Sequence, residues 1–240
     1  RYFVSMVLDL TPAPLPKTGE SVGVNFGVAR LATLSTGERI PNPRYLSKYE
    51  RRLKRKQREL ARKQKGSRRR ERCLEQLARI HEKIANCRKD VIQKLAWSLV
   101  CRFDTIYVED LNLRGMVKNH ALARSLSDAG IGYAIRAIEA KAAMHGKTVV
   151  KVDRFFPSSK LCSSCGVLQP EMPLSVREWR CASCGATHDR DENAAKNLLA
   201  AGQAVTARGG SVRPGIATAV QGSAQRSAHT LGSPPGIPRL

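Results

Sequence analysis

Four of the seven cysteines stand in two Cys-x-x-Cys pairs, a spacing that suits metal binding. Cys162 and Cys165 form the first pair, Cys181 and Cys184 form the second, and fifteen residues separate the pairs. A glycine follows each pair and allows the backbone to turn sharply behind the two sulfurs. This pattern is typical of a four-thiolate zinc ribbon, a closed and therefore structural site. We predict zinc at these four cysteines; four unligated thiols are the alternative.

The remaining cysteines, Cys73, Cys87 and Cys101, are spaced fourteen residues apart in a region of helical periodicity. We predict that they face the apolar side of that region and do not form disulfides. Unpaired cysteines fit a reducing compartment. Trp179, between the two zinc pairs, is a candidate for contact with nucleic acid, and packing inside the ribbon is its alternative role.

Two acidic residues stand where predicted elements begin or end. Glu109 follows the strand-like run Thr105–Val108, and Asp191 follows the ribbon at the start of a helical segment. Acidic groups gathered at strand ends in a basic protein suit Mg²⁺ chemistry on phosphodiesters, because oxygen ligands hold the ion that activates phosphate and water. Taken singly, an exposed Glu or an Asp that caps a helix is the simpler explanation of each.

Positive charge is the outlying feature of the composition, since 42 Lys and Arg against 20 Asp and Glu give a net charge of +22. Such a surplus indicates a polyanionic partner, most often nucleic acid. Residues 44–72 hold 15 basic and 3 acidic residues, hence +12 of the +22. A basic membrane-binding protein is the alternative, but no amphipathic helix sets Trp or Phe opposite the basic residues. The predicted nucleic-acid contacts are Lys54, Arg55, Lys56, Arg58, Arg68, Arg69, Arg70, Lys160 and Arg190.

Hydrophobic periodicity predicts the elements that position these residues. Alternating runs predict a three-strand meander and two further strands, over 21–28, 30–35, 38–40, 105–108 and 147–152. A long helical hairpin with a basic outer face is predicted over 44–102, with a break at Gly66-Ser67. A solvated coiled coil that binds nothing is the alternative for this hairpin. Further helices are predicted over 128–145 and from about Asp191 onward.

These elements divide the chain into five parts. Residues 1–20, a strand-like run and a Pro-rich linker, are expected to be the remnant of an upstream domain. We predict a main domain over 21–160 with its helical insert at about 44–102, a zinc ribbon over 161–187, a last segment of the main domain over 188–201, and a disordered basic tail over 202–240. No apolar run reaches the length of a membrane span and no leader opens the chain, so we expect a cytoplasmic protein without a membrane partner.

The order of these motifs resembles that of a known family. VGVNFGV, YVEDLNL, SSKLCSSCG, CASCG and HDRDENAAKN, read along residues 21–200, are similar to the OrfB or TnpB proteins of insertion sequences, which are RNA-guided DNA nucleases related to the type V CRISPR effectors. The resemblance implies an α/β fold, in which an RNase H-like (RuvC) domain carries a helical-hairpin insert and an inserted zinc ribbon. It also implies a DNA target, a guide RNA, and a catalytic Mg²⁺ site of three acids, two of which are Glu109 and Asp191.

Two departures from the family pattern shape the expected function. Asn25 stands where the family has the first metal-binding Asp, and a neutral amide cannot bridge two metal ions as a carboxylate does. The family's recognition modules precede the nuclease domain, whereas about twenty residues precede it here. We therefore expect a fragment or truncated chain, or recognition supplied elsewhere.

The main hypothesis is a transposon-associated, RuvC-like DNA endonuclease whose cleavage is impaired by Asn25. A nuclease-inactive, nucleic-acid-binding relative is the alternative. A third interpretation is an unrelated zinc-ribbon protein with a basic coiled coil, which requires the matches at Glu109 and Asp191 to arise by chance. The sequence does not indicate an oligomeric state.

Overall fold

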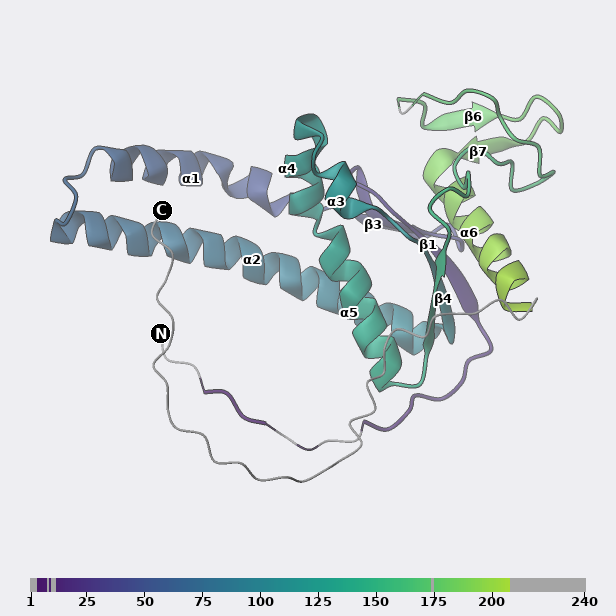
Figure 1. The fold of residues 1–240 in the computed structure, drawn as a ribbon, viewed down its shortest axis with the longest axis horizontal. Helices are drawn as coiled ribbons and strands as arrows, with labels where there is room; N and C mark the ends of the chain where they lie inside the picture. Colours follow the sequence, from purple (N-terminus) through teal and green to yellow (C-terminus); the bar gives the residue numbers. More distant parts are fainter. Residues whose placement is uncertain (1–3, 8, 10–11, 174, 208–240) are drawn as a thin grey trace.

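The computed structural model describes residues 4–7, 9, 12–173 and 175–207 and contains a five-stranded mixed sheet with helices on both faces (Figure 1). The strand order is β3-β2-β1-β4-β5. The strands are β1 (Ser21–Phe26), β2 (Arg30–Leu34), β3 (Arg39–Pro41), β4 (Thr105–Glu109) and β5 (Thr148–Val152). β1, β2 and β3 form an antiparallel meander, and β4 and β5 run parallel to β1. The five predicted strands are therefore confirmed.

Among the described residues, helices form a hairpin and cover both faces of the sheet. They are α1 (Tyr45–Ala61), α2 (Arg68–Arg102), α3 (Leu113–Met116), α4 (His120–Ala129), α5 (Ile131–Met144) and α6 (Arg190–Ala207). A separate two-stranded sheet pairs β6 (Glu178–Arg180) with β7 (Thr187–Asp189). Within the described residues, no helix is long and apolar enough to span a membrane.

Three sequence expectations need correction. The helix predicted over 128–145 is α5, which begins three residues later at Ile131 because Gly130 adopts a left-handed φ of 68°; residues 128 and 129 end α4, and α3 and α4 were not predicted. Helix α6 continues to Ala207, so residues 202–207 are helical, while 208–240 lie outside the described residues. Residues 4–7 and 9 form no strand, contrary to the strand-like pattern of the opening run.

The main core lies between one face of the sheet and helices α2, α4 and α5. Val22 and Val24 of β1 belong to it, together with Leu99 of α2 and Ile138 of α5. The C-terminal half of the 35-residue α2 is buried there. Its N-terminal half projects from the sheet and packs on α1 through Leu53, Ile80 and Ile84 (Figure 1). The predicted helical hairpin is therefore confirmed. The C-terminal half of α2 anchors it in the core, and the start of α1 is held to α4, where Asp128 accepts a hydrogen bond from the N–H of Leu46 and Arg124 pairs with Glu50.

Helix α6 covers the opposite face of the sheet (Figure 1). Leu198 of α6 packs there with Tyr107 of β4. The helix comes so close to β1 that a Cβ atom at Gly23 would lie 2.0 Å from the carbonyl oxygen of Ala195. Position 23 therefore requires glycine, and this close contact determines where the start of α6 lies relative to β1.

The Pro-rich segment before β1 is fastened to the sheet. The buried ammonium group of Lys147 donates hydrogen bonds to the Pro16 carbonyl oxygen and to Asp104. Asp104 also accepts hydrogen bonds from the backbone N–H groups of Thr18 and Gly19. Lys147, supported by these backbone groups, lowers the pKa of Asp104 to about 2. The predicted linker thus has a defined path at the end of the sheet where β4 and β5 begin.

Candidate metal centres and nucleic-acid interface

The four predicted zinc ligands converge on one point. Their sulfur atoms all lie within 4.8 Å of one another, and no other group of three or more His, Cys, Asp or Glu side chains converges in this way among the described residues. Gly166 and Gly185, behind the two pairs, have positive φ values of 74° and 72°. Four convergent thiols are soft donors that suit a tetrahedral zinc ion and leave no coordination position open. The ligands are Cys162, Cys165, Cys181 and Cys184.

Strand β7 joins this ribbon directly to helix α6. The Nε2 atom of His188 lies 3.1 Å from the sulfur of Cys162. Trp179 of β6 packs against His188, with ring centroids 4.7 Å apart. This contact supports the packing role for Trp179. Because β7 ends at Asp189 and α6 begins at Arg190, the ribbon and the start of the helix are one continuous piece.

Asn25 and Glu109 lie side by side on the face of the sheet that α6 covers. The parallel register ends with the pair Val24 and Val108, and Asn25 and Glu109 are the next residues of β1 and β4. Side chains alternate between the two faces along a strand. Asn25 therefore shares the face of Gly23, and Glu109 shares the face of Tyr107, both of which touch α6.

The first turn of α6 brings Asp191 to the same edge. The Arg30 Nη1 atom, beside the end of β1, lies 3.9 Å from the Asp191 Oδ2 atom and 2.8 Å from that of Asp189. Asp189 caps the helix, because its Oδ1 atom accepts hydrogen bonds from the N–H groups of Asp191 and Glu192. Asp191 is therefore not the capping residue, so capping does not account for its carboxylate. We call Asn25, Glu109 and Asp191 the sheet-edge centre.

At this edge the surroundings shift the pKa values of Glu109 and Asp189 in opposite directions. Burial of the Glu109 carboxyl, reinforced by the negative charge of Asp110, raises the pKa of Glu109 above its ordinary value. Burial also acts to raise the pKa of Asp189, but hydrogen bonds from Arg30 and from the backbone N–H of Glu192 outweigh it and lower that pKa. Both causes disfavour the charged form of Glu109, so a bound cation would stabilise this carboxylate.

Two buried amides clamp the ribbon to α6, and the sequence analysis did not identify them. The Nδ2 atom of Asn197 donates to the carbonyl oxygens of Leu161 (2.6 Å) and Ser158 (2.8 Å). Asn193 donates to Leu161 at 2.7 Å, and its Oδ1 atom accepts the N–H of Ser163 at 2.9 Å. Both amides are at most 4% exposed. The i, i+4 spacing of two Asn residues on one helix face was the available signal.

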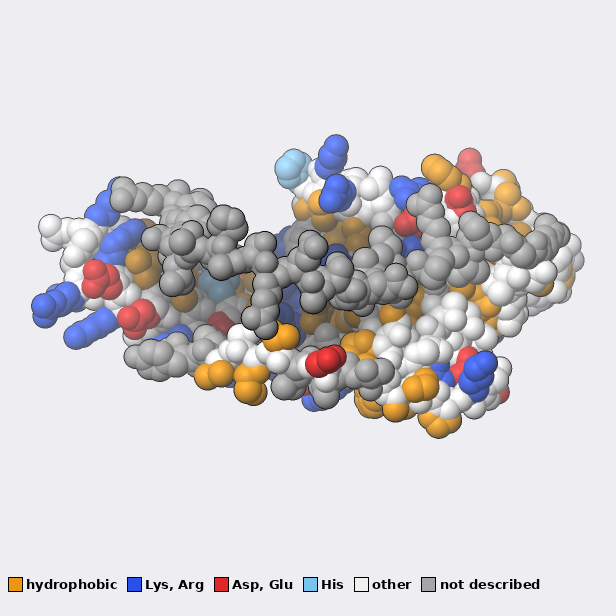
Figure 2. Space-filling model, turned by 60° about the horizontal axis from the view of Figure 1, so that its bottom comes forward, with side chains coloured by type: hydrophobic (Ala, Val, Ile, Leu, Met, Phe, Trp, Pro, Cys, Tyr) orange, Lys and Arg blue, Asp and Glu red, His pale blue; other side chains and the backbone are white. Residues whose placement is uncertain are grey.

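The basic residues predicted to contact nucleic acid differ in their exposure and in the partners that they already have. Arg70 closes the hairpin by donating to the Leu60 carbonyl oxygen at 3.0 Å, and Arg190 donates to the Pro173 carbonyl oxygen at 2.9 Å. Lys160 is half-buried at the start of the ribbon. Figure 2 shows Lys and Arg side chains projecting at the hairpin end of the molecule. The hairpin residues of the predicted set that are exposed are Lys54, Arg55, Arg58, Arg68 and Arg69, whereas Lys56 is half-buried and pairs with Glu59.

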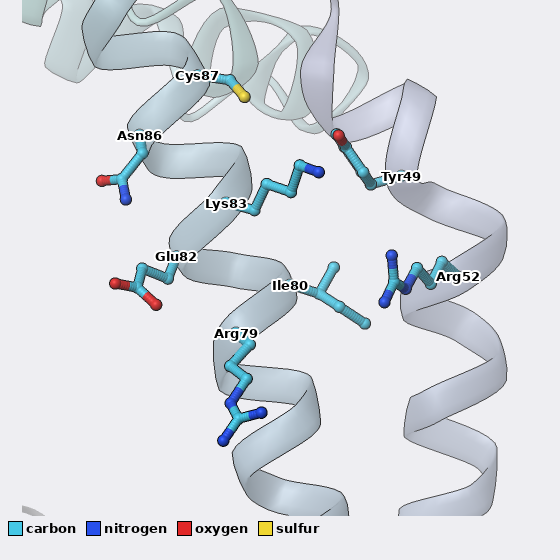
Figure 3. A pocket seen from close by; sticks show the side chains of 8 residues that line it. All are labelled: Tyr49, Arg52, Arg79, Ile80, Glu82, Lys83, Asn86 and Cys87. Carbon is cyan, nitrogen blue, oxygen red and sulfur yellow. The ribbon is translucent and has the colours of Figure 1, made fainter. Parts of the chain in front are cut away.

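A cavity of about 340 Å³ opens between α1 and α2. Figure 3 shows Arg52 of α1 and Lys83 of α2 pointing into the space between the helices. The Lys83 ammonium lies 5.7 Å from the centre of the Tyr49 ring. The basic character of the hairpin therefore extends from its outer face to the groove between its helices, where sequence reasoning had not placed it.

Comparisons with known proteins agree with this architecture. Residues 5–120 match the OrfB_IS605 family model, described as "Probable transposase", and residues 132–198 match the model of the Cas12f1-like TNB domain. The fold is similar to the cryo-EM structure of a Cas12f1-sgRNA-target DNA complex, with a TM-score of 0.54 and 20% identity over 77% of this chain and 50% of that one.

Sequence relatives carry related names. Over its whole length the chain is 43% identical to a Streptomyces pristinaespiralis protein named as a candidate RNA-guided DNA endonuclease, and it spans 60% of that protein. It is 34% identical, over 84% of its length, to the similarly named InsQ of Escherichia coli K12, of which it spans 54%. It is 30% identical over 54% of its length to the CRISPR-associated DNA-binding protein Cas12m of Allomeiothermus silvanus, of which it spans 25%. The chain belongs to the OrfB/TnpB family of insertion-sequence proteins.

Proposed function

We propose that this chain is the RuvC-like, RNase H-like portion of a transposon-associated DNA endonuclease that binds its DNA target under the guidance of an RNA. The observation that carries the proposal is the register of β1 and β4, which sets Asn25 beside Glu109 on the face where α6 presents Asp191. In this proposal the α1–α2 hairpin is an insert in the nuclease domain, and residues 161–187 are an inserted zinc ribbon.

The donors of the sheet-edge centre suit a hard divalent cation such as Mg²⁺. Glu109 and Asp191 supply carboxylate oxygens, and Asn25 supplies one neutral amide oxygen. A bound divalent cation would supply Lewis-acid activation of the scissile phosphate. Glu109 and Asp191 would hold and orient the site, while Asn25 leaves it one negative charge short. We infer that cleavage is slow for this reason and that the architecture for it is otherwise retained.

Binding of the nucleic acid is assigned to the basic residues of the hairpin. The exposed arginines Arg55, Arg58, Arg68 and Arg69 and the groove residues Arg52 and Lys83 offer charges along one projecting element. Such contacts attract phosphates regardless of sequence. Two relatives are named for RNA-guided DNA cleavage and the structural neighbour was solved with RNA and DNA, which supports RNA and DNA as partners here.

A second function, binding without cleavage, is favoured by one observation. Arg30 is ion-paired to Asp189 and lies 3.9 Å from Asp191, so a positive charge already stands beside one of the two remaining carboxylates. A resident guanidinium competes electrostatically with a divalent cation. The name of Cas12m, a DNA-binding protein, is consistent with such a role in this family.

The substitution Asn25→Asp distinguishes the two functions. It restores a carboxylate of nearly the same shape, so we expect tighter Mn²⁺ binding by electron paramagnetic resonance. We also expect cleavage of single-stranded DNA in Mg²⁺ to rise on the order of a thousandfold, equivalent to about 4 kcal/mol of transition-state stabilisation. Glu109→Gln in the Asn25→Asp background is expected to abolish the gain.

Three outcomes are informative. If the unmodified protein already cuts as fast as the Asn25→Asp variant, the assignment of residue 25 to the metal site is wrong. Tighter Mn²⁺ binding without cleavage favours the binding function. Unchanged Mn²⁺ affinity in both variants contradicts the metal site itself.

A further inference from the structure

Phe155 is a large apolar side chain that the fold leaves in solvent. Its side chain is 86% exposed, whereas Trp97, the next most exposed aromatic residue in the described part of the chain, is 44% exposed and packs edge-on against His145. Burying a phenyl ring is worth about 1.5–3 kcal/mol, so a ring that the fold leaves in solvent can supply this stabilisation to a ligand.

The backbone around Phe155 is fixed rather than loose. The Oδ1 atom of Asp153 accepts the N–H of Phe155 at 2.7 Å, and the carbonyl oxygen of Asp153 accepts the N–H of Phe156 at 3.0 Å. Phe156 packs against the core cluster that contains Tyr107 and Leu198. One phenylalanine of the pair therefore anchors the turn, and the other is presented outward.

This turn stands next to the sheet-edge centre. The register of β4 and β5 pairs Glu109 with Val152, so the turn begins one residue beyond the partner of Glu109. Asp110, which follows Glu109, donates its N–H to the Val152 carbonyl oxygen at 2.9 Å. Its carboxylate accepts a hydrogen bond from the guanidinium of Arg154. Side-chain and backbone bonds thus tie the turn that presents Phe155 to the strand end that carries Glu109.

We propose that Phe155 is a stacking platform for one base of a single-stranded nucleic acid, positioned beside the sheet-edge centre. This inference rests on the proposed function, because it names how that centre holds its substrate strand. A phenyl face accepts any base, so the platform binds without sequence preference. The Arg154–Asp110 pair holds the turn in place and leaves phosphate binding to other basic groups.

A nucleic acid fits this ring better than an apolar protein surface does. The chain carries a net charge of +22, which attracts polyanions and repels basic partners. The ring is also presented singly, next to a strand end bearing Glu109 and Asp110, rather than within an apolar groove. Stacking on an isolated aromatic ring is the way in which proteins hold a base of a flexible single strand.

The test measures binding of a fluorescein-labelled oligothymidylate of about ten nucleotides, a length within the usual site size of single-strand binders. Affinity is followed by anisotropy for the unmodified full chain and for Phe155→Ala, Phe155→Leu and Phe155→Trp. The alanine variant is expected to lose about fivefold to a hundredfold in affinity, the usual range for one stacked base. The leucine variant is expected to lose nearly as much, and the tryptophan variant to retain binding.

Two further arms make the assignment specific. With oligomers that carry an abasic site at successive positions, the Phe155→Ala loss is expected to disappear at one position, since the base that stacks is then missing. In Phe155→Trp, added oligothymidylate is expected to quench the fluorescence of the new indole. Trp97→Leu is the matched control, because it removes an exposed aromatic ring from α2 and is expected to leave affinity unchanged.

The outcomes separate this inference from the proposed function. If Phe155→Ala binds oligothymidylate as tightly as the unmodified chain, the platform is wrong and the proposed function stands. If Phe155→Leu keeps full affinity, residue 155 contributes an apolar contact without stacking, which also overturns the platform. If the unmodified chain binds no oligonucleotide, both proposals fall.

Discussion

The zinc ribbon and the sheet-edge centre are built in opposite ways. The ribbon gathers four cysteines from two turns that lie within residues 162–184, and all four ligands are present. The sheet-edge centre gathers residues 25, 109 and 191 from two strands and a helix, and in the proposed function Asn25 stands in place of one of its three acids. A site assembled from distant segments keeps its scaffold when one ligand is lost, because Val22, Gly23 and Val24 hold β1 in place independently of residue 25.

The two regions nevertheless share helix α6. The helix starts where the ribbon ends, and Asn193 and Asn197 hold the first residues of the ribbon through buried hydrogen bonds. Asp191, two residues before Asn193, belongs to the same turn of the helix. The position of a proposed catalytic carboxylate therefore depends on a structural unit that takes no part in the chemistry.

The largest expected effect follows from loss of the ribbon metal. Cys165→Ser is expected to reduce zinc from about one ion per chain to almost none and to unfold the ribbon, because structural zinc supplies apparent binding free energies of about 10–16 kcal/mol. Metal analysis measures the first effect. Hydrogen exchange measures the second, with faster exchange expected across residues 162–189 and into the start of α6.

Cys87→Ser is the matched control, since this half-buried cysteine lies on α2 away from the ribbon. It is expected to leave zinc content unchanged. A Cys165→Ser chain that lacks zinc but keeps a protected ribbon and start of α6 would show that the ribbon does not need its metal to position Asp191.

A smaller effect is expected from removing only the two buried amides, Asn193 and Asn197, that join the ribbon to α6. Replacing Asn193 and Asn197 with Ala leaves the buried carbonyl oxygens of Ser158 and Leu161 without these donors, at a cost of about 1–3 kcal/mol for each unsatisfied group. Zinc content should stay at the unmodified level, whereas Mn²⁺ binding at the sheet-edge centre should weaken. Zinc analysis and Mn²⁺ paramagnetic resonance on one sample measure both.

Asn119→Ala controls for loss of an asparagine, because Asn119 is exposed and caps α4. This substitution should change neither the zinc content nor the affinity for Mn²⁺. If the clamp variant also keeps full Mn²⁺ affinity, the ribbon and the sheet-edge centre are independent units, and the comparison between them loses its connecting element.

The smallest effect on either centre is expected from the hairpin. Replacing Lys54, Arg55 and Lys56 with Ala should leave zinc and Mn²⁺ binding unchanged while weakening nucleic-acid binding of every sequence. The slope of log affinity against log salt concentration should flatten by up to about three units, at roughly 0.7–0.9 per lost phosphate contact. Affinity measurements over a series of salt concentrations determine the slope.

A variant with the same charge change on α2 instead of α1, at Lys89, Lys94 and Arg102, separates specific contacts from net charge. These residues lie toward the sheet-bound half of the helix. We expect a smaller change of slope for them. Equal slopes in the two triple variants would mean that the hairpin provides no particular contacts and is a solvated pair of helices.

The local patterns of the chain were sufficient for much of this architecture. The Cys-x-x-Cys pairs predicted the ribbon ligands because a tetrahedral site needs only two short turns facing each other. Alternation predicted β1 to β5, and hydrophobic periodicity over 44–102 predicted the hairpin. The same reasoning missed the break at Gly130, because apolar residues continue with helical spacing on both sides of it.

Other features depended on contacts that no local pattern contains. Asp189 rather than Asp191 caps α6, and Asp189 also pairs with Arg30 of β2, which is distant in sequence. That Asn193 and Asn197 are buried amides follows from the return of residues 158–163 to the helix. Sequence by itself determined the metal-binding residue types, the main strands and long helices, and the family. Tertiary structure decided which of the charged and polar groups meet, because burial and pairing arise only when distant segments pack together.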